Sequence, residues 1–120
     1  MVSFAEIQQG QAIIAVVGLG YVGLPLAAAF GKQVPVIGFA IREAKIAELK
    51  EGHDSTGELT SEALASTCIE YTADPSLLKK ASFIIVTVPT PLRSDKKPDL
   101  YPLEASSTTI GQNLQPGSIV

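Results

Sequence analysis

The 120-residue sequence has no tryptophan, one cysteine, one histidine and few charged residues. A single cysteine excludes an intrachain disulfide framework, and no Cys/His group has zinc-ligand spacing, so we expect no metal site. Nine Lys and Arg against twelve Asp and Glu give a net charge of −3, which argues against a general nucleic-acid binder. The apolar content of 46% excludes disorder by composition, and the length suits one domain.

The uncharged stretch 12–30 is long enough on paper to cross a bilayer. Three glycines and a proline interrupt it, which would weaken a continuous helix. No Lys or Arg precedes Lys32, so the positive region of a signal peptide is missing. We therefore interpret the stretch as a buried strand, a glycine turn and a buried helix of a cytoplasmic protein without a membrane partner.

Short apolar runs alternate along the chain with segments typical of helices. This alternation predicts βαβ units, and hence an α/β fold with a doubly wound parallel sheet of the Rossmann type. Ligands of such sheets bind beyond the carboxyl ends of the strands. Strands are predicted at 13–17, 34–39, 69–72 and 83–88, and the start of another at 118–120. Helices are predicted after the glycines as far as Gly31, at 42–50, from a cap at Thr60 or Ser61 through Ser66, from Asp74-Pro75 onward, and at 102–114.

A GxGxxG motif begins at Gly18, directly after an apolar strand and before a helix, which is the context that dinucleotide binding demands. Gly18 permits the tight turn, Gly20 lets a diphosphate approach the backbone, and Gly23 lets the helix lie close to the strand. The N–H groups of Tyr21 and Val22, together with the helix dipole, offer a site for anionic oxygens. The alternative is a glycine turn that serves only helix–strand packing.

Dinucleotide sites of this kind have a second element, a carboxylate at the end of the second strand that binds the adenosine ribose. Here that position holds Ala40. Losing a charged hydrogen-bonding partner costs about 1.5–3 kcal/mol, roughly a tenfold to hundredfold loss of affinity for NAD. Arg42 could instead meet the 2′-phosphate of NADP, as arginines do in related sites. The alternative, which the sequence favours, is that Arg42 is a solvated residue at a helix start.

Four separated motifs carry a resemblance to a known family: GLGYVGLPL at 18–26, FAIREAKIAEL at 39–49, VTVPTP at 86–91 and PDLYPL at 98–103. In this order and spacing they resemble the N-terminal domain of the UDP-glucose/GDP-mannose dehydrogenase family. The segment GHDST at 52–56 resembles the branch that acts on UDP-N-acetylhexosamines and makes uronic acids for surface polysaccharides.

The resemblance implies an oxidoreductase that converts the C6 alcohol of a nucleotide sugar to a carboxylate, with two NAD molecules each accepting a hydride. It implies a homodimer for the full-length enzyme. Ala40 departs from the family's ribose-binding aspartate, and Lys45 stands where the family usually has an arginine near the ribose. By position, the resemblance assigns cofactor binding to Gly18, Gly20, Tyr21, Val22, Gly23, Lys45, Val88, Pro89 and Thr90, beside Ala40 and Arg42.

No catalytic residue is assigned, because the family's catalytic cysteine, lysine and asparagine lie in later segments. We expect Cys68 to be a small buried hydrophobe and His53 to lie at the surface. The sequence then predicts a dinucleotide-binding domain over 1–120, truncated before its last strands. Alternatives are a UDP-glucose or GDP-mannose dehydrogenase and, in another class, a stand-alone dinucleotide-sensing module. A hydroxyacyl-CoA or phosphogluconate type of dehydrogenase fits the motifs less well.

Overall fold

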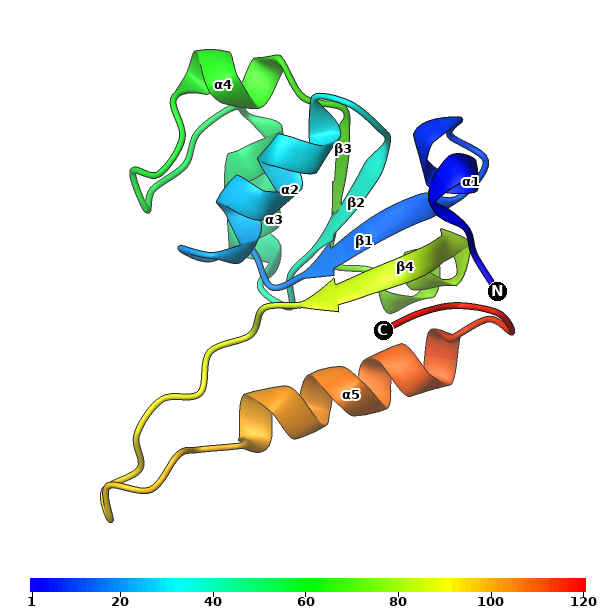
Figure 1. Ribbon diagram of the computed structural model, residues 1–120. Helices are drawn as coiled ribbons and strands as arrows, with labels where there is room; N and C mark the ends of the chain where they lie inside the picture. Colours follow the sequence, from blue (N-terminus) through cyan, green and yellow to red (C-terminus); the bar gives the residue numbers. More distant parts are fainter.

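The computed structural model describes all 120 residues and contains one four-stranded parallel sheet (Figure 1). The strand order is β3-β2-β1-β4, so the chain passes outward from β1 in one direction and then crosses to its other side. This order and the parallel pairing confirm the predicted doubly wound Rossmann-type sheet. The strands are β1 Ile13–Val17, β2 Val36–Phe39, β3 Ile69–Thr72 and β4 Ala81–Val86.

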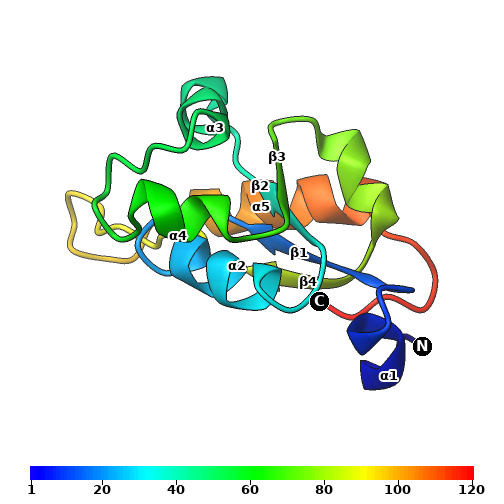
Figure 2. The same ribbon diagram turned by 90° about the horizontal axis from the view of Figure 1, so that it is seen from above.

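Helices cover both faces of the sheet and make a three-layer molecule. On one face lie α2 (Gly23–Gly31), α3 (Glu43–Lys50) and α4 (Ser61–Ala65), packed on a core that includes Ile14 and Val16. On the other face lie the 3-10 helix η1 (Pro75–Lys80) and α5 (Tyr101–Asn113), packed on a core that includes Ala15 and Val17. Figures 1 and 2 show α5 on the side of the sheet opposite α2.

Alternate residues of β1 face the two cores, and this explains its composition. Ala15 and Val16 are fully buried although they point to opposite faces. A strand covered on both sides needs apolar residues at every position rather than an alternating pattern. The unbroken run Ile13–Val17 is therefore what a central strand of this sheet requires.

Several predicted element boundaries shift by a few residues. Pro35, which cannot donate to a ladder, lies just before β2, so the strand begins at Val36 rather than at position 34. β4 covers Ala81–Val86 instead of 83–88. The segment that begins at Asp74-Pro75 forms the 3-10 helix η1, with the Asp74 carboxylate accepting from the Ser76 N–H at 3.0 Å.

The two ends of the chain lie near each other at the amino ends of the strands (Figure 1). Helix α1 (Phe4–Gln8), which the sequence did not reveal, is capped by Ser3, and the Val2 N–H donates to the Gly117 carbonyl at 3.0 Å. Ile119 bridges Phe83 in parallel, in line with the strand start predicted at 118–120. No helix has both the length and the apolar character needed to cross a membrane.

The prediction of a buried cysteine was wrong, because Cys68 is exposed. It precedes β3, and β3 is an edge strand that has a neighbour on one side only. Its N–H donates to the Gly31 carbonyl at 2.8 Å, and its carbonyl accepts from the Val36 N–H at 3.0 Å. The backbone of Cys68 is thus fixed by the fold while its side chain faces solvent.

Candidate functional site

A hollow of about 430 Å³ opens at the carboxyl ends of the strands. It lies where the chain direction across the sheet reverses, between the segments that follow β1 and β4. Crevices at such switch points are the usual ligand sites of open parallel sheets. The lining residues are Val17, Gly18, Leu19, Gly20, Phe39, Ala40, Ile41, Arg42, Lys45, Ser55, Thr56, Val88, Pro89 and Ser106.

Gly18 makes the sharp turn by which the chain leaves β1. Its φ is +101°, a value that side chains rarely tolerate. Its N–H donates to the Phe39 carbonyl at 2.9 Å, which extends the β1–β2 ladder by one residue beyond the strand. A Cβ at this position would lie 3.1 Å from the Thr87 backbone. The first glycine of the motif is therefore required by the fold.

Gly20 and Gly23 have different reasons to be glycine. A Cβ added to Gly20 meets nothing within 4 Å, so the space beside it is open. A Cβ added to Gly23 would overlap with the Gly18 carbonyl oxygen and Thr87 Oγ1. Gly23 is thus needed for the close approach of α2 to β1 and β4. At Gly20, in contrast, the folded protein has room for a side chain.

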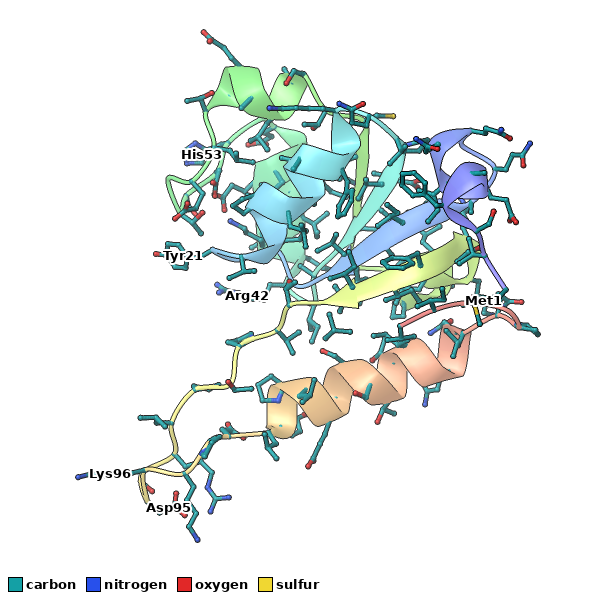
Figure 3. The ribbon with its side chains drawn as sticks, in the orientation of Figure 1. Met1, Tyr21, Arg42, His53, Asp95 and Lys96 are labelled. Carbon is teal, nitrogen blue, oxygen red and sulfur yellow. The ribbon has the colours of Figure 1, made fainter.

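The backbone N–H groups of residues 19–23 donate to no other group of the protein. These residues flank Gly20 at the start of α2, whose dipole favours negative charge at this end. Tyr21 and Val22 are exposed, and Figure 3 shows Tyr21 pointing away from the sheet. Unpaired donors around an open glycine fit the diphosphate of a dinucleotide.

Thr87, which the sequence analysis missed, holds the glycine turn in place. Its N–H donates to the Val17 carbonyl at 2.8 Å. Its hydroxyl donates to the Gly18 carbonyl at 2.8 Å and reaches the Val17 carbonyl at 3.2 Å. A polar residue within the apolar run 83–88 was the available signal. The hydroxyl joins the segment after β4 to the turn after β1.

The ribose end of the hollow is formed by Ala40, Arg42, Lys45, Ser55 and Thr56. Ala40 directly follows β2, and its N–H donates to the Thr72 carbonyl at 3.1 Å. The structure therefore puts the alanine at the strand end where related sites have their acid. Figure 3 shows Arg42 at the same end of the molecule as Tyr21.

Asp54 organises the loop that closes this end of the hollow. Its buried carboxylate accepts from Lys45 Nζ at 3.3 Å, from the Thr56 N–H at 3.0 Å and from the Thr56 hydroxyl. The N–H groups of Glu58 and Leu59 donate to its second oxygen at 3.0 and 2.9 Å. Burial alone would raise the pKa of Asp54, but these hydrogen bonds outweigh it and lower the pKa to about 2.

The residues predicted for cofactor binding are only partly brought together. Val88 and Pro89 line the hollow, whereas Thr90 is exposed and does not. Tyr21, Val22 and Gly23 lie beside it at the start of α2. The lining residues that the sequence analysis did not assign to this site include Ser55, Thr56 and Ser106. Ser106 comes from the buried face of α5, which a sequence motif does not reveal.

Neither the lone cysteine nor the lone histidine belongs to a reactive group. Cys68 lies before β3, at the end of the sheet opposite the hollow, and His53 is exposed as expected (Figure 3). No three His, Cys, Asp or Glu side chains are grouped so that they could hold a metal ion. The arrangement can bind and orient a ligand.

A second hollow, of about 500 Å³, lies at the amino ends of the strands. Its walls are mostly apolar side chains such as Phe4, Ile7 and Phe30, and no charged residue lines it. It offers no positive charge to a phosphate group, so the carboxyl-end hollow, which Arg42 and Lys45 line, is the candidate site despite its smaller volume.

Comparisons with known proteins agree with this geometry. The sequence model of the UDP-glucose/GDP-mannose dehydrogenase family, NAD binding domain, matches residues 12–120. Protein CapL of Staphylococcus aureus is 54% identical over 89% of this chain and 25% of its own length. UDP-N-acetyl-D-glucosamine 6-dehydrogenase of Pseudomonas aeruginosa is 49% identical over 89% of this chain and 26% of its own.

A solved structure of a UDP-D-ManNAc dehydrogenase from Pyrococcus horikoshii has a TM-score of 0.78 and 34% identity, over 88% of this chain and 27% of that one. The chain thus spans about a quarter of the length of the relatives it matches. With the glycine turn, the strand order and the family match in agreement, the chain belongs to the UDP-glucose/GDP-mannose dehydrogenase family and carries its NAD-binding domain.

Proposed function

We propose that the chain is the cofactor domain of a nucleotide-sugar 6-dehydrogenase, which oxidises the C6 alcohol of a UDP-N-acetylhexosamine to the uronic acid. The observation that carries the proposal is the open glycine turn with its unpaired N–H groups, within a chain of this family. A nicotinamide dinucleotide, NAD in the family whose model the chain matches, is the proposed hydride acceptor, and when bound it supplies the redox chemistry. The catalytic residues belong to parts of the enzyme outside these 120 residues.

This chain's residues bind and orient the dinucleotide. The N–H groups around Gly20 hold the diphosphate, and the hydroxyl of Thr87 keeps the turn in the geometry that presents them. Val88 and Pro89 provide an apolar wall at the end of β4 that excludes water from one side of the cofactor. Because the bound cofactor is already held in one pose, less translational and rotational entropy remains to be lost in the chemical step.

The UDP-N-acetylhexosamine assignment is supported by the names of the relatives. One is a UDP-N-acetyl-D-glucosamine 6-dehydrogenase, and a solved relative is a UDP-D-ManNAc dehydrogenase. The GHDST segment that suggested this branch borders the cofactor hollow through Ser55 and Thr56. The segment therefore supports membership of this branch through sequence similarity and not through a contact with the sugar. UDP-glucose and GDP-mannose are the alternative substrates.

Two measurements test the proposal. Calorimetric titration of the chain with NAD should give binding, and AMP should compete with it; no binding of any dinucleotide would refute the cofactor role. Assayed in the full-length protein, UDP-N-acetylglucosamine should reduce NAD faster than UDP-glucose or GDP-mannose. A faster rate with either of these would refute the substrate assignment.

The coding sequence beyond Val120 distinguishes an enzyme from a sensing module. Continuation into a second domain with a catalytic cysteine supports the dehydrogenase, and a stop codon at that point supports a stand-alone dinucleotide-sensing module. For the longer protein we propose a homodimer, which its elution volume in size-exclusion chromatography would test.

A further inference from the structure

The ribose end of the hollow presents cations and no carboxylate. Arg42, Lys45 and Ala40 line the same hollow as the glycine turn. In sites that select NAD, an acid at the position of Ala40 accepts hydrogen bonds from the ribose hydroxyls, and its charge repels a 2′-phosphate. Replacing it by a methyl group removes both the attraction for NAD and the repulsion of NADP.

The nearest loop acid cannot take over the role of the missing one. The Asp54 side chain is completely buried, and both of its oxygens already accept hydrogen bonds. These partners hold it inside the 54–59 loop, and it does not line the hollow. Glu43 and Glu48 of α3 do not line it either. No acceptor for the ribose hydroxyls is therefore offered by a carboxylate of this chain.

Arg42, in contrast, has no partner. Its side chain takes part in no ion pair and no hydrogen bond. It is exposed at the start of α3, three residues after β2 ends at Phe39. A guanidinium is always charged and matches the geometry of a phosphate with two parallel hydrogen bonds. Lys45 adds a second positive charge at this end, partly offset by Asp54.

We propose that this end of the site recognises a 2′-phosphate through Arg42, so that NADP binds more tightly than NAD. The inference rests on the proposed dinucleotide role of the hollow and specifies its ligand. Because charge-assisted contacts to a phosphate are strong, we expect NADP to bind roughly tenfold or more tighter than NAD. NAD keeps the diphosphate contacts and binds weakly, so both dinucleotides are ligands of the same site.

The test is calorimetric titration of the chain with NAD and with NADP, for the wild type and three variants. Arg42→Ala should weaken NADP about tenfold and leave NAD almost unchanged. Ala40→Asp should reverse the preference by strengthening NAD and weakening NADP. Lys32→Ala removes an exposed cation at the far end of α2, and its preference should match the wild type. Melting temperatures show whether each variant is folded.

The outcomes separate this inference from the proposed function. NADP binding that is tighter than NAD binding, with the difference lost in Arg42→Ala, supports it. NAD binding as tight as or tighter than NADP in the wild type overturns it and leaves the dinucleotide role standing. An equal loss for both ligands in Arg42→Ala also overturns it. If neither ligand binds the wild type or Ala40→Asp, the dinucleotide role itself fails.

Discussion

Replacing Gly20 with alanine should weaken dinucleotide binding without harming the fold. The added methyl group meets no protein atom within 4 Å, and φ of Gly20 is outside the left-handed region. Such a change typically stabilises a protein by about 0.4–1 kcal/mol, because the unfolded chain becomes less flexible. The methyl group would occupy the open space that we assign to the diphosphate.

The matched control is Gly23→Ala, three residues along the same motif. Its Cβ would overlap with the Gly18 carbonyl oxygen and the Thr87 hydroxyl, so the backbone or Thr87 must shift. Overpacking of this kind costs about 1–3 kcal/mol, which lowers the melting temperature by roughly 4 °C or more. The two alanine variants therefore have opposite expected effects on stability.

Binding and stability are measured side by side on the two variants. Gly20→Ala should lose one or more charge-assisted hydrogen bonds, about 1.5–3 kcal/mol, a roughly tenfold to hundredfold loss of affinity in calorimetry. Its melting temperature should equal or exceed that of the wild type. If Gly20→Ala binds dinucleotides as the wild type does, the diphosphate does not approach Gly20 and the proposed site is wrong.

Three further predictions concern residues whose roles emerged from the structure. Thr87→Val leaves the Gly18 carbonyl without its 2.8 Å donor. It should lower the free energy of unfolding by about 1 kcal/mol and should also lower dinucleotide affinity, whereas Thr87→Ser should restore both. A Thr87→Val variant with wild-type affinity would contradict the role of the hydroxyl in holding the glycine turn. The pKa of Asp54 is lowered to about 2, so its carboxylate should stabilise the folded protein fully above about pH 4. This contribution should be lost as the pH falls towards 2, and the free energy of unfolding measured in urea should fall by about 2 kcal/mol. Asp54→Asn should be less stable at pH 7 by about 3 kcal/mol and lack this acid-dependent loss, and an unchanged pH profile would refute the assignment. Cys68 should react with a thiol reagent in the native protein nearly as fast as in urea, whereas protection would mean that it is buried after all.

Much of the architecture could be read from local patterns. The run Ile13–Val17 has no polar position, and this alone predicts a strand covered on both faces. Gly18 was predicted to make the tight turn, and its positive φ confirms this. Boundaries were less accurate, as at β4, because an apolar residue such as Val88 can lie in a strand or line a hollow with equal ease.

The roles of Asp54 and Thr87 could not be read in this way. Asp54 stands in a polar loop, and nothing local shows that its side chain turns inward to meet Lys45. Thr87 contacts a carbonyl that is 69 positions away in the sequence. Cys68 was wrongly expected to be buried, because a strand's place at the edge of the sheet is not written in its own residues.

By itself, the sequence indicated the alternation of strands and helices from Ile13 onward, the glycine turn and the loss of the ribose-binding acid at Ala40. These depend on the side chain or backbone freedom of single residues and on their neighbours along the chain. Only the tertiary structure decided which hydroxyl fixes the turn and which acid is unable to replace the missing one. Those answers depend on distances between segments that the parallel sheet brings together, and such distances exist only once the chain has folded.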